Sequence, residues 1–295
     1  MKSVVLKFST PKFYDLYNTC HAHGWKNLSP FEWRTDRLSF ALLAGKTPVD
    51  VEVKQLKNTL RASISSNRLL TKPALAELIK KLRRTLDLDV DTTALHEIAS
   101  VVGEQYADLV VQGCGRRLCS ATLWEDAAKT LFTTNCSWAL TKKMCAAACS
   151  EHFTKPAPSG RFPFPAPDSF ATKTPAELKV LMTVGYRAPY LHELAQRFVS
   201  DPALGGVENA SRTDAFSTVN DLLGFGDYAT NHLLMMAGHF QQVPVDSVVA
   251  GFVLKAHGAK EPTSFVRKHY AAWGQYQFWG FKLDQIVHRK NWLGD

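Results

Sequence analysis

The sequence lacks a long apolar run and has no Cys-x-x-Cys pair. No stretch of about 18 apolar residues occurs in its 295 positions, and the first residues are too polar for a signal peptide. The six cysteines end at Cys149, so we expect no cysteine-ligated iron–sulfur cluster near the C-terminus and no cysteine-based zinc site. Free thiols in a reducing compartment are the simpler interpretation. The sequence therefore predicts a soluble, intracellular protein without a membrane anchor.

Acidic residues are outnumbered by basic ones. The chain has 35 Lys and Arg against 27 Asp and Glu, a formal net charge of +8. A basic surface attracts polyanions, although charge alone identifies no partner. With 45% hydrophobic residues, the chain can bury one large core or two to three ordinary domains.

Two textures divide the chain. Short alternating runs at 3–8, 37–45, 49–56 and 59–65 predict strands, and an amphipathic helix follows from Pro73. From Thr92 onward, apolar spacings of three and four predict helices at 93–112, 123–135, 139–153, 175–185, 190–201 and 213–224. A loop at 155–169 carries five prolines. We predict a mainly helical protein in which a small α+β domain with an antiparallel sheet (1–87) precedes an all-α region (88–295).

A glycine-rich turn lies within residues 220–249. We expect a helix to end at Leu222 or Leu223, a tight hairpin at Gly224-Phe225-Gly226, and a second helix from about Asp227. Glycines permit positive φ and close approach of another backbone, and amides at a helix start can bind a phosphate oxygen. Phe225 would anchor the hairpin in the core. Taken alone, the pattern favours an ordinary helix C-cap and turn, which unrelated helix pairs use often.

An acid follows an apolar Val-Pro-Val run about twenty residues after the hairpin. Cleavage of an N-glycosidic bond builds positive charge on the sugar, and a carboxylate can stabilise that charge and activate water. Asp246 is a candidate for this role. It is also a candidate N-cap for the helix that starts at Ser247, and spacing alone does not separate the two roles.

Taken in order, these motifs resemble the helix-hairpin-helix DNA glycosylase superfamily, in particular 8-oxoguanine DNA glycosylase and bacterial 3-methyladenine DNA glycosylase II. The resemblance covers most of the chain. It includes the polar loop at 133–137, Phe164-Pro165, Gly-Tyr-Arg-Ala-Pro-Tyr at 185–190 and Tyr-Ala-Ala-Trp-Gly-Gln at 270–275. It implies a helix-hairpin-helix at about 210–238 and a monomeric enzyme that excises damaged bases from double-stranded DNA.

The resemblance also implies how the chain would hold DNA. The hairpin from Gly224 to Asp227 would bind the backbone, and Tyr186 and Arg187 would fill the gap that an extruded nucleotide leaves. Asn135 would lie near the opposite base. Without the resemblance, Tyr186 and Arg187 would be a helix-connecting turn with a packed ring and a solvated guanidinium.

A cation and a base pocket are implied in the same way. Main-chain carbonyls of Asn220, Leu222 and Phe225 would hold a monovalent cation, Na⁺ or K⁺. Gln275 and Trp279 align with residues that read and stack on the base, although aromatic rings at helical spacing are usually core. The candidate pocket residues are Tyr228, Gln275, Trp279, Trp138, Trp124 and His232.

The sequence departs from the family at one chemically decisive position. Members that also cleave the strand carry a catalytic lysine two residues after the second hairpin glycine, and here that residue is Tyr228. Its neighbours Asp227, Ala229 and Thr230 have no amine. We therefore predict hydrolysis by an activated water, without AP lyase activity, and an alkylated purine as the substrate.

Two alternatives stay open at this point. The enzyme could instead excise 8-oxoguanine or hypoxanthine, because Gln275 could hydrogen-bond the edge of an oxidised or deaminated purine. A non-catalytic DNA-damage-binding protein could use the same hairpin, although binding alone gains nothing from Asp246 beside phosphates. A DNA repair protein of this kind would work in the cytoplasm or nucleoid of a bacterium or in the nucleus of a eukaryote.

Overall fold

A computed structural model describes residues 1–289, which fold into two compact units. The first unit comprises Met1–Pro11, Asp15–Val90 and Arg117–Gly205. The second comprises Lys12–Tyr14, Asp91–Arg116 and the chain from Gly206 onward. The first unit thus joins the sheet to helices from the middle of the chain. The division of the chain into domains 1–87 and 88–295 stays a prediction.

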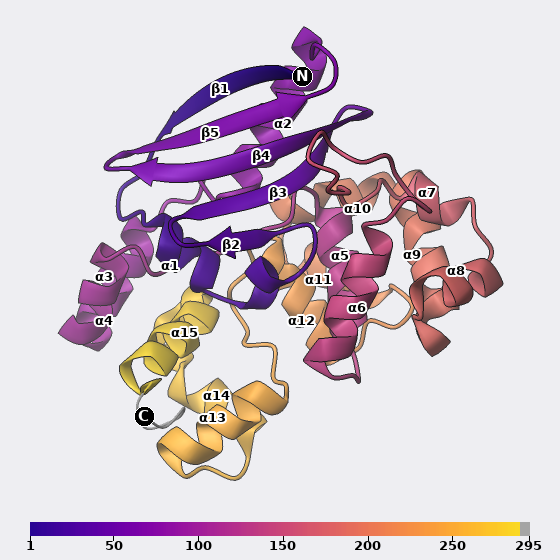
Figure 1. The fold of residues 1–295 in the computed structure, drawn as a ribbon. Coiled ribbons are helices and arrows are strands. Elements are labelled where there is room, and N and C mark those ends of the chain that lie inside the picture. Colours follow the sequence, from indigo (N-terminus) through magenta and orange to yellow (C-terminus); the bar gives the residue numbers. More distant parts are fainter. Residues whose placement is uncertain (290–295) are drawn as a thin grey trace. The chain divides into compact units, whose positions relative to one another are not determined.

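The sheet of the first unit is antiparallel throughout, as predicted. Within residues 1–289 its strands follow the order β1-β5-β4-β3-β2 (Figure 1). They are β1 (Lys2–Ser9), β2 (Glu32–Arg34), β3 (Arg37–Ala44), β4 (Thr47–Leu56) and β5 (Thr59–Ser66). Gly45 closes the turn between β3 and β4 at φ 58°, a left-handed conformation that glycine adopts without strain.

The alternation of β4 gives the sheet a buried face. Val49, Val51 and Val53 are buried, whereas the residues between them, Asp50 and Glu52, are half-buried. Helix α2 (Lys72–Thr85) lies along the sheet and buries Leu78 and Leu82 (Figure 1). Its N-cap Thr71 accepts a hydrogen bond from the Ala74 amide, which fixes where the helix begins.

The rest of the first unit is mainly helical. The proline-rich stretch before α7 has no regular secondary structure and contains a turn, in which the Gly160 amide donates to the Ala157 carbonyl at 2.9 Å. The helices are α1 (Leu16–His21), α5 (Leu123–Thr133), α6 (Trp138–Ala148), α7 (Asp168–Ala171), α8 (Pro175–Met182) and α9 (Ala188–Ser200); α10 (Pro202–Gly206) follows at the boundary.

The second unit is helical, and its elements correct two expected boundaries. Gly103 divides the helical pattern at 93–112 into two helices, and the first hairpin helix ends at Asn220 rather than at Leu222 or Leu223. The helices are α3 (Thr93–Val102), α4 (Glu104–Val111), α11 (Arg212–Asn220), α12 (Asp227–Met236), α13 (Ser247–His257), α14 (Pro262–His269) and α15 (Gln277–Val287).

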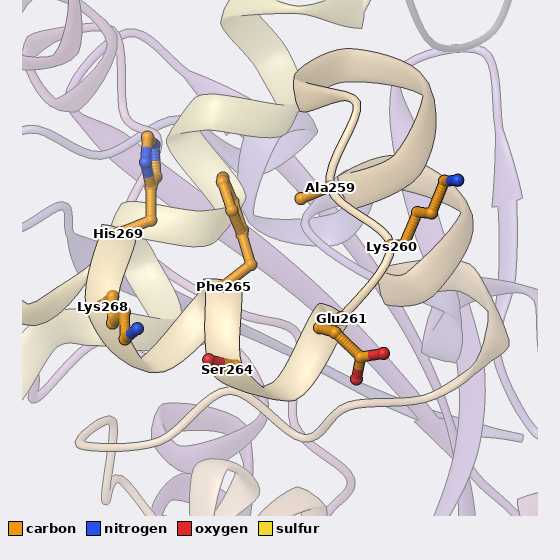
Figure 2. A pocket seen from close by; sticks show the side chains of 7 residues that line it. All are labelled: Ala259, Lys260, Glu261, Ser264, Phe265, Lys268 and His269. Atoms are coloured by element: carbon orange, nitrogen blue, oxygen red, sulfur yellow. The ribbon is translucent and has the colours of Figure 1, made fainter.

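A shallow hollow of about 420 Å³ opens in the second unit (Figure 2). It is bordered by α14 and by the loop that joins α13 to α14. Its lining residues are Ala259, Lys260, Glu261, Ser264, Phe265, Lys268 and His269. Across the described part of the chain, every helix is too short or too polar to cross a bilayer.

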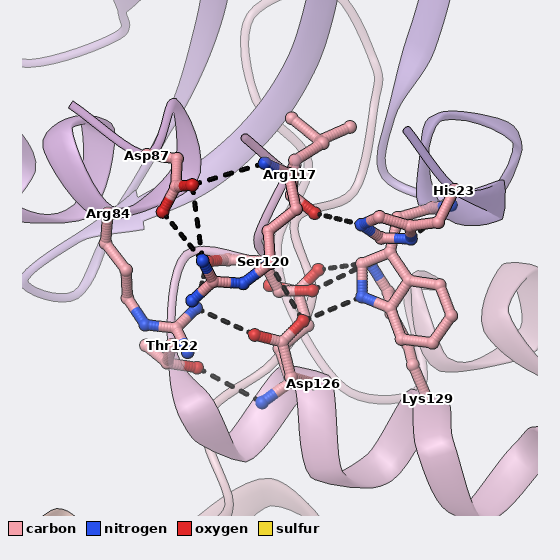
Figure 3. A network of polar contacts seen from close by, with 11 residues as sticks. His23, Arg84, Asp87, Arg117, Ser120, Thr122, Asp126 and Lys129 are labelled. Atoms are coloured by element: carbon pink, nitrogen blue, oxygen red, sulfur yellow. Dashed lines mark hydrogen bonds and ion pairs between the residues drawn. The ribbon is translucent and has the colours of Figure 1, made fainter. Parts of the chain in front are cut away.

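A buried polar network joins α2 to α5 in the first unit (Figure 3). The Asp126 carboxylate accepts hydrogen bonds from Trp25 Nε1 at 2.7 Å, the Ser120 amide at 3.0 Å and Arg84 Nη1 at 2.8 Å. Burial acts to raise the pKa of Asp126, but the Arg84 charge and these hydrogen bonds outweigh it and lower the pKa. The ionised carboxylate therefore stabilises the fold.

We predict that Asp126→Asn lowers the free energy of unfolding by about 3 kcal/mol, because it removes the buried negative charge that Arg84 Nη1 contacts at 2.8 Å. Urea denaturation followed by tryptophan fluorescence measures the loss. Asp89→Asn is the matched control, since Asp89 pairs with Arg83 at the surface and should cost less than about 1 kcal/mol.

The pKa shift also fixes the sign of the pH dependence. The contribution of Asp126 is complete above the ordinary value of 3.8 and disappears as the pH falls through its lower folded value. Equal losses of unfolding free energy in Asp126→Asn and Asp89→Asn would contradict the stabilising role of this network.

Candidate active site

The hairpin between α11 and α12 has the predicted geometry. Gly224 adopts φ 86°, the Phe225 side chain is buried, and α12 begins at Asp227. The Phe225 amide donates to the Leu222 carbonyl at 3.0 Å, and Thr230 Oγ1 donates to the Phe225 carbonyl at 3.4 Å. Phe225 thus anchors the turn in the core and can offer DNA only its main chain.

The two glycines of the hairpin differ in backbone conformation and in surroundings. Gly224 needs a positive φ, whereas Gly226 has an ordinary φ of −85° and is exposed. Among the described residues, none has a heavy atom within 4 Å of a Cβ added at Gly226. The Thr230 amide makes the first helical bond, to the Gly226 carbonyl at 2.9 Å, so the amides before it have no acceptor inside the helix. The start of α12 is a bare, amide-rich surface.

The predicted cation carbonyls belong to this same turn. The carbonyls of Leu222 and Phe225 each accept one hydrogen bond from the hairpin. A carbonyl oxygen has two lone pairs, so each keeps one that a monovalent cation could use. The donor set fits such an ion, and its binding by Asn220, Leu222 and Phe225 stays a prediction.

Asp246 is the N-cap of α13. Its Oδ1 accepts from the amides of Val248 at 2.9 Å and Val249 at 2.8 Å. Asp246 is half-buried. Within residues 1–289, neither of these bonds uses Oδ2, so the cap fixes the carboxylate while one oxygen stays available for chemistry.

Lys282 of α15 is the feature that the sequence did not reveal. Burial lowers the pKa of Lys282 to about 8, and the negative charge of Asp246 acts in the opposite direction. An amine therefore interacts electrostatically with the candidate catalytic carboxylate. Its Nζ donates to Gln285 Oε1 at 2.9 Å. The two groups are 36 positions apart in the sequence, so inspection of the neighbours of Tyr228 could not find it.

The predicted base-pocket residues of the second unit fall into two environments. Tyr228 is half-buried, and its ring centroid lies 5.6 Å from that of His232, which is buried. Trp279 is 2% exposed and packs on Phe240. Gln275 is exposed. The structure brings Tyr228 and His232 together, whereas Trp279 has the packing of a core residue.

The predicted base-pocket tryptophans of the first unit also differ from each other. Trp124 is buried among phenylalanines, and its Nε1 donates to the Pro165 carbonyl at 2.9 Å. This packing favours a core role. Trp138 is 39% exposed at the start of α6, so its ring is accessible.

The predicted wedge residues lie in the first unit beside an exposed loop. Tyr186 is 52% exposed, and Asn135 is exposed with φ 45°. Arg187 is buried, and its guanidinium donates to the Thr134 carbonyl and stacks on Tyr186 with 4.5 Å to the ring centroid. Arg187 thus holds the loop of Asn135 and the ring of Tyr186. Direct contact of these residues with DNA stays a prediction.

We predict that an added methyl group destabilises the protein at one hairpin glycine and has little effect at the other. Gly224→Ala should lower the free energy of unfolding by about 1–2 kcal/mol, because alanine is strained at positive φ. Gly226→Ala, the control, should leave stability within about 0.5 kcal/mol of the parent protein. Chemical denaturation measures both, and an equal loss at Gly226 would disprove the assigned turn geometry.

No family profile matches the sequence, and no curated protein matches it. Solved structures share its fold. The 3-methyladenine DNA glycosylase from Archaeoglobus fulgidus has 15% identity and a TM-score of 0.72, over 96% of this chain and 99% of that one. The Clostridium acetobutylicum 8-oxoguanine glycosylase/lyase without DNA has 16% identity and a TM-score of 0.72, over 96% and 95%. Its complex with DNA that carries cytosine opposite 8-oxoguanine has 14% identity and a TM-score of 0.70, over 97% of this chain and 98% of that one. This chain is therefore similar in fold to DNA glycosylases.

Proposed function

We propose that the protein is a monofunctional DNA N-glycosylase, which extrudes a damaged purine from duplex DNA and hydrolyses its N-glycosidic bond. The proposal rests above all on one observation. Asp246 caps α13 through Oδ1 alone, shortly after a hairpin whose exposed Gly226 starts an amide-rich helix end. The shared fold of two kinds of DNA glycosylase supports it.

The chemistry assigned to Asp246 follows from its fixed position. Loss of the base leaves an oxocarbenium-like sugar, whose positive charge a nearby carboxylate stabilises. Two backbone amides already hold Asp246, so little reorganisation is needed as that charge develops. The same carboxylate would orient and activate the water that attacks the sugar.

Binding of duplex DNA is assigned to the hairpin through its main chain. The bare start of α12 offers amides and the positive end of the helix dipole to a phosphate oxygen. The net charge of +8 adds long-range attraction, so affinity should fall as salt rises. On the first unit, the exposed Tyr186 would fill the gap that the extruded nucleotide leaves, and the exposed Asn135 would lie near the opposite base.

An alkylated purine is the proposed substrate. The Tyr228 and His232 rings lie together at the start of α12, and aromatic faces attract cationic, alkylated bases. A second candidate is 8-oxoguanine or hypoxanthine, because the exposed Gln275 amide could both donate and accept at a purine edge. The enzyme would act as a monomer.

We predict that Asp246→Asn slows base release at least about 100-fold. Asparagine is also a good N-cap, so the variant should keep the fold of α13 while it loses the charge. Duplexes that carry 3-methyladenine, 1,N6-ethenoadenine, hypoxanthine, uracil or 8-oxoguanine are incubated with each protein and then treated with alkali. Strand breaks then report the released bases.

The control for this assay is Glu97→Gln, since Glu97 is an exposed acid of α3 in the same unit. It should keep the parent rate. Base release by Asp246→Asn at the parent rate would disprove the assignment. Tight binding of a lesion by the parent protein without release would favour the damage-binding alternative.

We predict that strand breaks require alkali, because Tyr228 stands where bifunctional relatives place their lysine. Lys282 is the amine to test, since its pKa near 8 leaves part of it unprotonated at neutral pH. Breaks without alkali, with a covalent adduct trapped by borohydride, would contradict the prediction. If Lys282→Met abolished that adduct, the lysine would be identified as the nucleophile.

A further inference from the structure

Three histidines of the second unit surround one buried carboxylate within residues 1–289. Asp284 of α15 has a side chain only 2% exposed. His257 Nε2 lies 2.8 Å from its Oδ2, His269 Nε2 lies 3.9 Å from its Oδ2, and His288 Nε2 lies 3.4 Å from its Oδ1. These imidazoles come from the ends of α13, α14 and α15. Side chains far apart in sequence thus converge on one oxygen pair.

We propose that His257, His269 and Asp284 bind a divalent transition-metal ion, with Zn²⁺ as the first candidate and water in the remaining position. One ligand atom from each of these three residues lies within 4.8 Å of the others. Imidazole nitrogen and carboxylate oxygen are the ligand types that suit Zn²⁺. The proposal is independent of the glycosylase function.

Hydrogen bonding explains only part of this cluster. Tyr270 Oη donates to Oδ2 at 2.7 Å and Tyr106 Oη to Oδ1 at 3.1 Å, and with His257 they fill most acceptor sites of Asp284. At 3.9 Å, His269 lies beyond hydrogen-bond distance. A tetrahedral ion with bonds of about 2.0–2.1 Å separates its ligand atoms by about 3.3 Å. The observed separations lie on both sides of this value, so modest imidazole rotations would admit the ion.

The surroundings supply outer support for such an ion. Tyr270 and Tyr106 would keep the Asp284 carboxylate oriented, as partners of metal ligands commonly do. Metal binding would replace the Nε2 proton of His257, leaving a neutral ring protonated at Nδ1. Three protein ligands would leave one position of a tetrahedral ion for water.

The hollow beside α14 gives an ion a way in. His269 borders it together with Phe265, and the His269 side chain is 42% exposed (Figure 2). The ring centroids of His269 and His257 are 4.8 Å apart, so the exposed imidazole adjoins the more buried one. His269 is therefore the ligand that an ion would contact first from solvent.

We predict that the chelator-treated protein binds one Zn²⁺ per chain in titration calorimetry and that Zn²⁺ raises the Tm. His269→Gln should weaken the affinity at least tenfold, and Tyr270→Phe about tenfold, because the latter removes only outer support. His269 is partly exposed, so its substitution should leave the protein folded. His152→Gln is the matched control, since it replaces an exposed histidine of the first unit.

Coordination can be followed without any activity assay. Bound Co²⁺ should give the visible absorption of a tetrahedral complex in the parent protein and in His152→Gln, and lose it in His269→Gln. Absence of saturable Zn²⁺ binding would overturn the proposal, as would equal affinity in His269→Gln and the parent protein. A Tm that responds to pH but not to Zn²⁺ would show instead that the cluster is a hydrogen-bond hub.

Discussion

The cap at the start of α13 is the interaction on which the candidate site depends. Two amides, those of Val248 and Val249, converge on one oxygen of Asp246. An uncapped helix would leave these amides unsatisfied, so the same bonds that begin α13 also set the direction of the carboxylate. The Lys282 amine interacts electrostatically with this carboxylate, although burial lowers the pKa of Lys282 to about 8. The same carboxylate therefore caps α13 and is held in place for the chemistry proposed for it.

Much of the fold could be predicted because its signals are local. Short alternating runs identified the longer strands, and the Gly-Phe-Gly turn identified the hairpin, because each pattern specifies its own backbone geometry. The three residues of β2 were too few for a periodic signal. Helix ends were less well determined. Apolar residues continue after Asn220, but Leu222 is buried in the turn rather than in the helix, so hydrophobicity placed the end of α11 too late.

The candidate site was less predictable, because its residues act through neighbours in space. Trp124 and Trp279 have the sequence context of pocket residues, yet both are buried in packed aromatic clusters, and helical spacing is the same for a core and for a pocket. Arg187 was predicted to contact DNA, which stays a prediction. The sequence did not show that its guanidinium donates to the Thr134 carbonyl. Lys282 and the histidines around Asp284 had no motif at all. Their significance arises only when α13, α14 and α15 come together.

Helix α15 contributes residues both to the candidate catalytic site and to the proposed metal site of the second unit. It carries Lys282, which interacts with Asp246 at the start of α13, and Asp284, which His257 meets at the end of α13. The two helices are thus linked at the candidate catalytic carboxylate and again at the histidine cluster. A metal ion in the cluster would fix α15 against the last turn of α13 and so limit the movement of Lys282 relative to Asp246. Because Asp246 is held by its own cap bonds, loss of the ion should loosen this arrangement before it removes the carboxylate from its place.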